Sequence, residues 1–200
     1  MDIEILNYGV GNLFSLKCTL QKIETNPKIV TINELKKNID GLILPGVGSF
    51  TEAMENIGAF KKKILDIKDS GIPIMGICLG MQIFFKESEE GKGEGLDLIP
   101  GRVIKLPNQV KIPHMGWNNL RIVRNNEIIE GLANDSYVYF VHSYYPLPLR
   151  KDVIITETEY GVRFPSILAH KNLYGTQFHP EKSGEAGQII LKNFVKLIKR

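Results

Sequence analysis

The stretch from Ile72 to Phe85 constrains the fold more than any other part of this chain. It reads Ile-Pro-Ile-Met-Gly-Ile-Cys-Leu-Gly-Met-Gln-Ile-Phe-Phe, an apolar strand pattern that leads through a glycine-flanked cysteine into a helical pattern. A sharp strand-to-helix turn that raises a nucleophile above the edge of a sheet has this form, and Gly76 and Gly80 leave the room that it requires. The sequence therefore predicts an α/β fold in which Cys78 occupies the turn.

The rest of the chain agrees with a single α/β domain over residues 1–200. A hydrophobic content of 43% is enough for one sheet covered on both faces. Apolar runs in the first half alternate with helical periodicity, which is typical of a buried, mostly parallel sheet. The strands predicted there are Ile3–Asn7, Lys28–Ile32, Gly41–Leu44 and Ile72–Met75.

Between residues 102 and 180 the pattern changes to short strands separated by turn residues. We expect these strands to form an additional antiparallel region. They are Val103–Leu106, Leu120–Val123, Tyr137–His142, Val153–Thr158, Ser166–His170 and Tyr174–Phe178. Apolar spacing predicts a final helix over Ala186–Lys199, and residues 87–100, rich in Glu, Gly and Lys, are expected to be a mobile loop.

His179, Pro180 and Glu181 follow the last of these strands. Because residues i and i+2 of an extended segment point to the same side, Glu181 can hold one ring nitrogen of His179 while the other faces a thiol. A cysteine, a histidine and an orienting carboxylate form a nucleophilic triad, and a thiol at a helix N-terminus meets the positive end of the helix dipole, which favours the thiolate. Alone, Cys78 resembles a small core residue and His179 a histidine bonded to backbone, but the combination predicts catalysis.

A third element is the stretch Leu42–Ser49, an apolar strand that ends in the turn Pro-Gly-Val-Gly before a helix with Ser49 at its N-cap. Such a turn can direct backbone N–H groups into a cleft. An N–H from Val47 or Gly48, together with that of Leu79, would complete an oxyanion hole for a tetrahedral intermediate. A plain strand-to-helix turn is the alternative for this stretch.

Three motifs resemble the sequence blocks of the class I, triad-type glutamine amidotransferases, in that family's order. They are Pro-Gly-Val-Gly at 45–48, Gly-Ile-Cys-Leu-Gly-Met-Gln at 76–82 and Thr-Gln-Phe-His-Pro-Glu-Lys at 176–182. The resemblance covers the full chain and implies that family's fold, an open mixed, mostly parallel sheet flanked by helices. It also implies hydrolysis of glutamine to glutamate and ammonia, with Cys78, His179 and Glu181 as the catalytic triad.

Four further stretches are similar, more narrowly, to the glutaminase subunits of imidazole glycerol phosphate synthases. They are Asn7–Leu13, Pro45–Phe50, Pro113–Asn118 and Phe140–Ser143. This resemblance implies a heterodimer with a (β/α)8-barrel cyclase, which uses the ammonia to make imidazole glycerol phosphate and AICAR in histidine biosynthesis. Related glutaminase subunits also serve the amidation of surface sugars, and the sequence leaves that alternative open.

The resemblance also implies roles for residues around the triad. Gln82 lies one helical turn after Cys78 on the same face, where its amide can reach a ligand held at the thiol. By resemblance, the substrate glutamine is contacted by Gln82, by Glu90 near its α-amino group, and by the backbone of Ser143 and Tyr144 near its carboxylate. Four residues match positions that flank the family's subunit interface: Asn12, Trp117, Tyr139 and Lys182. For Trp117, a half-buried core aromatic is the alternative.

Composition narrows the possible functions. The net charge of +3 is small and lysines alternate with acids, which argues against nucleic-acid binding. The two cysteines form no disulfide framework, and Cys18 lies in an amphipathic pattern as a core residue. No apolar run approaches the roughly 20 residues that span a bilayer, so we expect no membrane binding. A strand pattern begins at Ile3 in place of the charged leader and apolar core of a signal peptide, so we expect a cytoplasmic protein. The four histidines lack partners at zinc-ligand spacing, and we expect neither metal nor cofactor.

Two other function classes share parts of this pattern. A stand-alone cysteine hydrolase would keep Cys78 and His179 but accept larger acyl groups, whereas a non-catalytic α/β binding module would lack part of the triad. The glutamine-directed motifs argue against the first class, and the complete triad argues against the second. Because free ammonia becomes ammonium in water, we further expect direct transfer to a partner. We also expect the isolated subunit to be nearly inactive, with activation acting through the turn at Gly46–Gly48.

Overall fold

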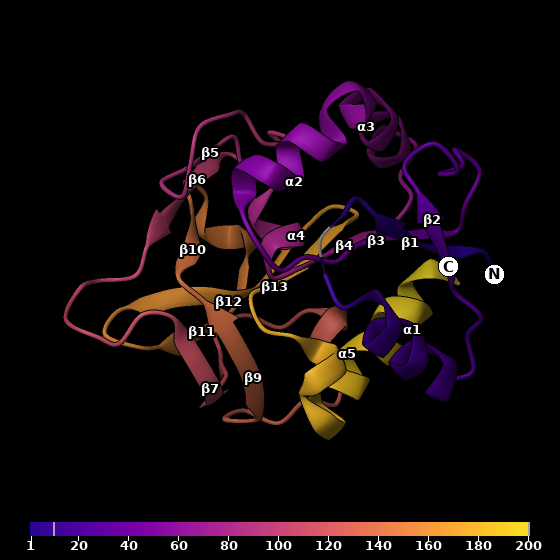
Figure 1. Cartoon of the computed structure of the whole chain (residues 1–200). Coiled ribbons are helices and arrows are strands. Elements are labelled where there is room, and N and C mark those ends of the chain that lie inside the picture. The colour runs from indigo at the N-terminus through magenta and orange to yellow at the C-terminus, as the bar shows by residue number, and fades with distance from the viewer. Residues whose placement is uncertain (10, 200) are drawn as a thin grey trace.

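A mixed eight-stranded sheet runs through the molecule, and the computed structural model describes residues 1–9 and 11–199 (Figure 1). Val10, within the motif Asn7–Leu13, lies outside the described residues. In the sheet, β2, β1, β3, β4 and β13 are parallel, whereas β12, β11 and β8 continue it by antiparallel pairs. In sheet order the strands are β2 (Lys28–Thr31), β1 (Ile3–Asn7), β3 (Gly41–Leu44), β4 (Ile74–Ile77), β13 (Leu173–Thr176), β12 (Arg163–His170), β11 (Ile154–Glu159) and β8 (Arg121–Ile122).

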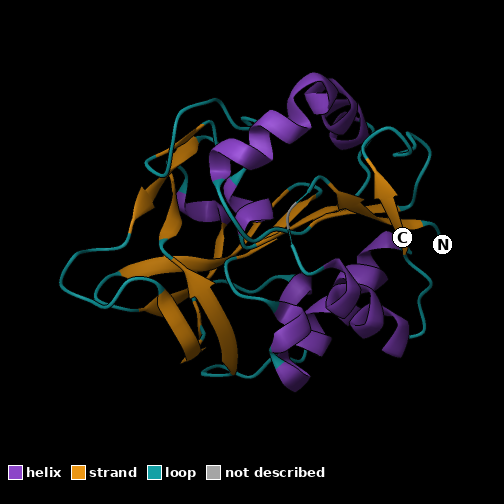
Figure 2. Ribbon diagram, in the orientation of Figure 1, coloured by secondary structure: helices purple, strands orange, loops and turns teal. Residues whose placement is uncertain are grey.

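Helices cover both faces of this sheet, as Figures 1 and 2 show. On one face lie α2 (Phe50–Ile57), η1 (Gly58–Phe60), α3 (Lys61–Asp69) and α4 (Leu79–Gln82), and on the other lie α1 (Leu13–Lys22) and α5 (Gly184–Ile198).

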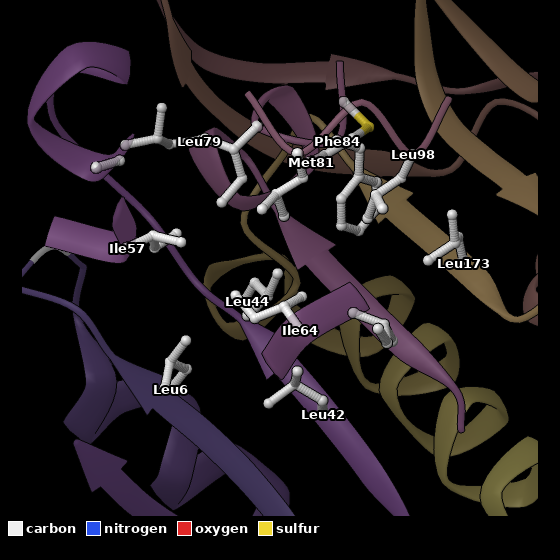
Figure 3. Packing of buried hydrophobic residues seen from close by; sticks show 14 of the residues in the cluster. Leu6, Leu42, Leu44, Ile57, Ile64, Leu79, Met81, Phe84, Leu98 and Leu173 are labelled. Atoms are coloured by element: carbon white, nitrogen blue, oxygen red, sulfur yellow. The ribbon is translucent and has the colours of Figure 1, made fainter. Parts of the chain in front are cut away.

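Each face has its own buried cluster, because successive strand side chains point to opposite sides. Leu6 of β1 and Leu44 of β3 belong to the first cluster, and their neighbours Ile5 and Ile43 belong to the second. Figure 3 shows the first cluster, to which Leu44 of β3 and Ile64 of α3 both belong. The helices are therefore held on the sheet by its alternating apolar side chains.

Two smaller sheets lie beside the antiparallel part of the central sheet. One contains β10 (Tyr144–Pro148), β6 (Gly101–Lys105) and β5 (Glu87–Ser88), and the other pairs β7 (His114–Asn119) with β9 (Tyr137–His142). The β7–β9 pair has one buried face and one exposed face. The short helices η2 (Glu127–Ile129), η3 (Lys151–Val153) and η4 (Pro180–Lys182) complete the set of elements in the described residues.

Most predicted strands are present, with shifted bounds. β4 begins and ends two residues after the predicted strand Ile72–Met75, because its ladder pairs Ile74 with Leu42 and extends to Ile77. The additional antiparallel region is present, but four of the six short runs became β8, β11, β12 and β13 of the central sheet. β7 and β10 were not predicted as strands, because Gly116, Pro146 and Pro148 weaken the strand pattern.

The loop predicted over residues 87–100 is anchored rather than free. It begins with β5, and Leu96, Leu98 and Ile99 are buried in the first cluster. The backbone N–H of Gly95 donates to the carbonyl of Lys86 at 2.8 Å. The prediction of a mobile loop is therefore wrong for its second half, since three apolar side chains in a polar-looking segment tie it to the core.

Candidate active site

Cys78 occupies the turn between β4 and α4 in a conformation that is rare for a residue with a side chain. Its φ is +54°, and it is only 5% exposed. The two flanking glycines are required by close backbone contacts: a Cβ on Gly80 would lie 1.7 Å from the carbonyl oxygen of Leu44, and one on Gly76 would lie 2.4 Å from that of Gly80. The predicted elbow is thus present, and packing against β3 fixes it.

The helix that follows is shorter than the sequence pattern suggested. α4 contains four residues, Leu79–Gln82, and the chain continues from it through turn-type hydrogen bonds at Phe84 and Phe85. A single helical turn has only a small macrodipole, so the expected help of a helix dipole to the thiolate is weak here. Stabilisation of a negative sulfur must come mainly from side chains near it.

His179 and Glu181 form the buried pair that the sequence predicted. Nδ1 of His179 lies 2.9 Å from Oε1 of Glu181, and both side chains are almost completely enclosed. The backbone of His179 is held at both ends, because its N–H donates to the carbonyl of Tyr139 and its carbonyl accepts from the hydroxyl of Ser183. The ring therefore has little freedom to turn.

The surroundings of His179 favour its protonated form. Burial lowers its pKa, but Cys78 and Glu181 oppose that effect by hydrogen bonding and by charge, and together they raise the pKa to about 10. Nε2 makes no hydrogen bond of normal length among the described residues, although Cys78 lies close enough to contribute to this shift. The contact is loose, as is usual for catalytic groups without substrate.

A pocket of about 270 Å³ opens beside the sulfur. It brings together every residue that was assigned to the oxyanion hole or to the substrate: Val47, Gly48, Leu79, Gln82, Glu90, Ser143 and Tyr144. Its walls also include Pro113, Val141 and His142, which the sequence analysis did not assign. Pro113, Val141 and His142 lie within stretches quoted above, but only the structure shows that this region around the β7–β9 pair closes this side of the pocket.

Gln82 is held by the protein through both of its N–H groups. Its Nε2 donates to the carbonyl of Tyr144 at 2.8 Å and to Oε1 of Gln177 at 3.1 Å. Only its oxygen remains to accept a hydrogen bond from a ligand. The carboxylate of Glu90 accepts a hydrogen bond from the backbone N–H of Phe50, at the start of α2, with a distance of 2.8 Å. Burial raises the pKa of Glu90 by more than this hydrogen bond lowers it.

The turn predicted to form the oxyanion hole is not open in this conformation. The N–H of Leu79 donates to the carbonyl of Gly46, at 3.4 Å. Because that carbonyl and the N–H of Val47 belong to one planar trans peptide, they point in opposite directions, and the N–H of Val47 faces away from Leu79. Tyr8, which the sequence analysis did not assign, donates its hydroxyl to the carbonyl of Pro45 and braces the turn.

Two buried histidines lie at the pocket wall: His142 is one of its lining residues, and His114 contacts His142. Nδ1 of His142 lies 2.9 Å from the carbonyl of Tyr144, so it carries the hydrogen, and Nε2 of His142 must accept from Nδ1 of His114 at 3.0 Å. Burial lowers the pKa of His142 to about 3 and that of His114 to about 4. Both rings are therefore neutral at pH 7, in defined tautomers.

The four residues assigned to a partner interface are at or near the surface. Trp117 on the exposed face of the β7–β9 pair is 56% exposed, and its ring meets that of Tyr139 edge to face at 6.0 Å. The amine of Lys182 lies 5.8 Å from the centre of the Tyr139 ring. Asn12 caps α1 by accepting from the N–H of Ser15. The alternative of Trp117 as a core aromatic is excluded.

Two negative findings concern the described residues only. None of their helices is long and apolar enough to cross a membrane. They include no cluster of three or more His, Cys, Asp or Glu side chains that could hold a metal ion.

The chain is similar to known proteins over nearly its whole length. The family model of class-I glutamine amidotransferases matches residues 4–198. The imidazole glycerol phosphate synthase subunit HisH of Methanocaldococcus jannaschii is 47% identical over 199 residues, 98% of this chain and 100% of that protein. The subunit of the same name from Methanothermobacter thermautotrophicus is 46% identical over 198 residues, 98% of this chain and 99% of that protein.

Solved structures share the fold at lower identity. A structure of a glutamine amidotransferase has a TM-score of 0.77 at 18% identity, covering 99% of both chains. PurLQS from Thermotoga maritima has a TM-score of 0.76 at 18% identity, covering 98% of both chains.

The lowered pKa values of His114 and His142 give a direct test of the pocket wall. Histidine in an unfolded chain is half protonated near pH 6.5, but a group with a folded pKa near 3 or 4 stays neutral well below that pH. We expect ¹⁵N NMR of the folded protein at pH 5.5 to show both rings neutral and protonated on Nδ1. The same protein in denaturant is the control, and titration of either ring near pH 6.5 in the fold would contradict the arrangement.

Proposed function

The chain belongs to the class I glutamine amidotransferase family, and we propose that it hydrolyses glutamine to glutamate and ammonia at Cys78. One observation carries this proposal: the buried pair of His179 and Glu181 lies beside a cysteine held at positive φ over a pocket of about 270 Å³. That volume suits a small amino acid rather than a peptide, which argues against a stand-alone cysteine peptidase.

The first half of the reaction forms a thioester. The thiolate of Cys78 attacks the side-chain carbonyl carbon of glutamine, and the negative charge moves to the carbonyl oxygen of a tetrahedral intermediate. When the intermediate collapses, the C–N bond breaks and the imidazolium of His179 gives its proton to the departing nitrogen, which leaves as ammonia. The raised pKa of His179 means that this proton is present at neutral pH.

The second half returns the enzyme to its starting state. His179, now neutral, takes a proton from water as that water attacks the thioester carbonyl, and the C–S bond then breaks to release glutamate. Glu181 accepts the hydrogen bond from Nδ1 of His179, which keeps Nε2 free for both proton transfers and stabilises the imidazolium. Each step uses only side chains and backbone groups of this chain, with glutamine and water.

The pocket offers groups for both ends of the substrate. We assign the carboxylate of Glu90, which lines the pocket, to the α-amino group, and the oxygen of Gln82 is left to accept a hydrogen bond from the ligand. The backbone of Ser143 and Tyr144 forms the opposite wall, where we place the α-carboxylate.

We further propose that the ammonia passes to a synthase partner in histidine biosynthesis. The relatives that are 46–47% identical over 98% of the chain are named as subunits of imidazole glycerol phosphate synthase, a name that requires another subunit. We expect that subunit to be a (β/α)8-barrel cyclase and the heterodimer to work in the cytoplasm. The exposed aromatic pair of Trp117 and Tyr139, with Lys182 against it, supports a docking surface on this side of the molecule.

The peptide between Gly46 and Val47 is our candidate for the switch that the partner operates. Rotation of this one peptide would release the N–H of Leu79 and turn the N–H of Val47 toward the site, so both oxyanion donors would form together. Gly46 has no room for a side chain, because a Cβ there would lie 2.7 Å from Cβ of Leu79. In the conformation described here, the isolated chain should bind glutamine but stabilise the intermediate poorly.

Replacement of the nucleophile tests the reaction. In the complex with its synthase partner, Cys78→Ala should reduce glutamate formation to less than about one-thousandth of the normal rate, because only weak electrostatic catalysis remains without a nucleophile. Cys18→Ala is the matched control and should leave the rate unchanged, since Cys18 lies on α1 away from the pocket lining. A Cys78→Ala protein that keeps more activity than this would contradict covalent catalysis.

Addition of the partner tests the switch. Loss of one oxyanion donor typically costs about a hundredfold to a thousandfold in rate, so we expect the isolated chain to hydrolyse glutamine at least about a hundredfold more slowly than the complex with nucleotide ligand bound. Steady-state assays of glutamate formation with and without the partner measure this ratio. An isolated chain that already works at the full rate would exclude the proposed role of the Gly46–Val47 peptide.

A further inference from the structure

Gln177 is a buried polar side chain beside the nucleophile that the mechanism above leaves unused. It lies between β13 and His179, it is completely buried, and it does not line the pocket. Its backbone N–H donates to the carbonyl of Ser166 at 2.9 Å, so the neighbouring strand holds it in place. Its side chain reaches the sulfur of Cys78 from behind the pocket, with 3.6 Å between Nε2 and Sγ.

The orientation of this amide follows from its neighbours. Oxygen and nitrogen of a glutamine side chain are distinguished by their hydrogen-bond partners. The carbonyl of Tyr144 can only accept, so the atom of Gln82 that faces it must be the nitrogen. The second N–H of that nitrogen points to Gln177, so the atom of Gln177 that accepts this hydrogen bond must be its oxygen. Gln177 is therefore left with its N–H groups toward the sulfur of Cys78.

The sulfur of Cys78 consequently has two partners besides His179. As a thiol it can donate to the carbonyl of Val141, at 3.7 Å. As a thiolate it loses that donation and faces the negative end of the carbonyl dipole, which opposes ionisation. The amide of Gln177 acts in the other direction, because a hydrogen bond donated to a charged acceptor is stronger than one to a neutral acceptor.

We propose that Gln177 is a positioning residue for the nucleophile, which donates a hydrogen bond to the thiolate of Cys78 and depends on Gln82 for its orientation. This inference rests on the proposed role of Cys78 and adds a group to it. The helix after Cys78 has a single turn and offers little dipole, so a side-chain donor takes over part of the stabilisation. Because Gln82 also faces the pocket, the hydrogen bonds from Gln82 to Gln177 and from Gln177 to Cys78 connect the substrate side of the site to the sulfur.

Alkylation of Cys78 by iodoacetamide tests the proposal without glutamine. The thiolate alone reacts, so the rate of alkylation against pH reports how readily the sulfur ionises. In a Cys18→Ala background, Gln177→Met keeps the length of the side chain and removes the donor. A hydrogen bond to a charged group is lost, and we expect alkylation at pH 7 to slow by about tenfold to a hundredfold. The pH of half-maximal rate should move upward.

Matched variants separate this role from a structural one. Gln177→Glu replaces the donor by an acceptor and should slow alkylation at least as much as Gln177→Met. Gln21→Met changes an exposed glutamine on α1 and should leave the profile unchanged. Folding of each variant is checked by thermal melting monitored by circular dichroism. If neither Gln177 variant folds, Gln82→Met supplies the test, since it removes the donor that orients Gln177 and should also raise the pH of half-maximal rate.

An unchanged alkylation profile in a folded Gln177 variant, or in Gln82→Met, would overturn the proposal. That result would leave the glutaminase reaction intact, because the unsubstituted protein in complex with its partner would still hydrolyse glutamine. Failure of the proposed function would instead appear as an absence of glutamine hydrolysis in that complex, whatever the alkylation profile. The two outcomes are therefore distinguishable.

Discussion

The contact between Gly80 and the carbonyl of Leu44 is the constraint on which the site depends. With 1.7 Å between an added Cβ and that oxygen, no side chain fits, so α4 can lie directly against β3. This close approach forces the chain into a sharp turn after β4 and places Cys78 at a φ of +54°. Because β4 lies between β3 and β13, the same end of the sheet presents the oxyanion turn, the nucleophile and the segment that leads to His179.

Much of this arrangement could be predicted from sequence, because short motifs carried it. The glycines around Cys78 and the spacing of His179 and Glu181 predict a triad without any knowledge of the sheet, and the hydrogen bond between the latter two is present. The sheet assignment of the short strands could not be predicted, because strand pairing depends on contacts far apart in the chain. β13, for example, joins β4 as a parallel neighbour across about a hundred residues.

The residues that sequence reasoning missed share a physical property: their roles are set by neighbours rather than by position in a motif. Gln177 and Tyr8 lie within motifs quoted above but were assigned no role, yet Gln177 donates to Cys78 and Tyr8 donates to the carbonyl of Pro45 in the oxyanion turn. His114 and His142 lie in different stretches, and only the pairing of β7 with β9 brings their rings within 3.0 Å. The blocked N–H of Leu79 depends on the orientation of a single peptide, which no composition or spacing reveals.

The central claim is that Cys78 is the nucleophile of a site that recognises glutamine, and covalent labelling with a diazoketone analogue of glutamine tests it most directly. The analogue needs both recognition of the amino-acid end and a reactive thiol, so it reports on the pocket and the sulfur together. Mass spectrometry of the labelled protein should show one label per chain, on Cys78, and excess glutamine should prevent it. A label on Cys18, or labelling of Cys78 that glutamine does not reduce, would contradict the account.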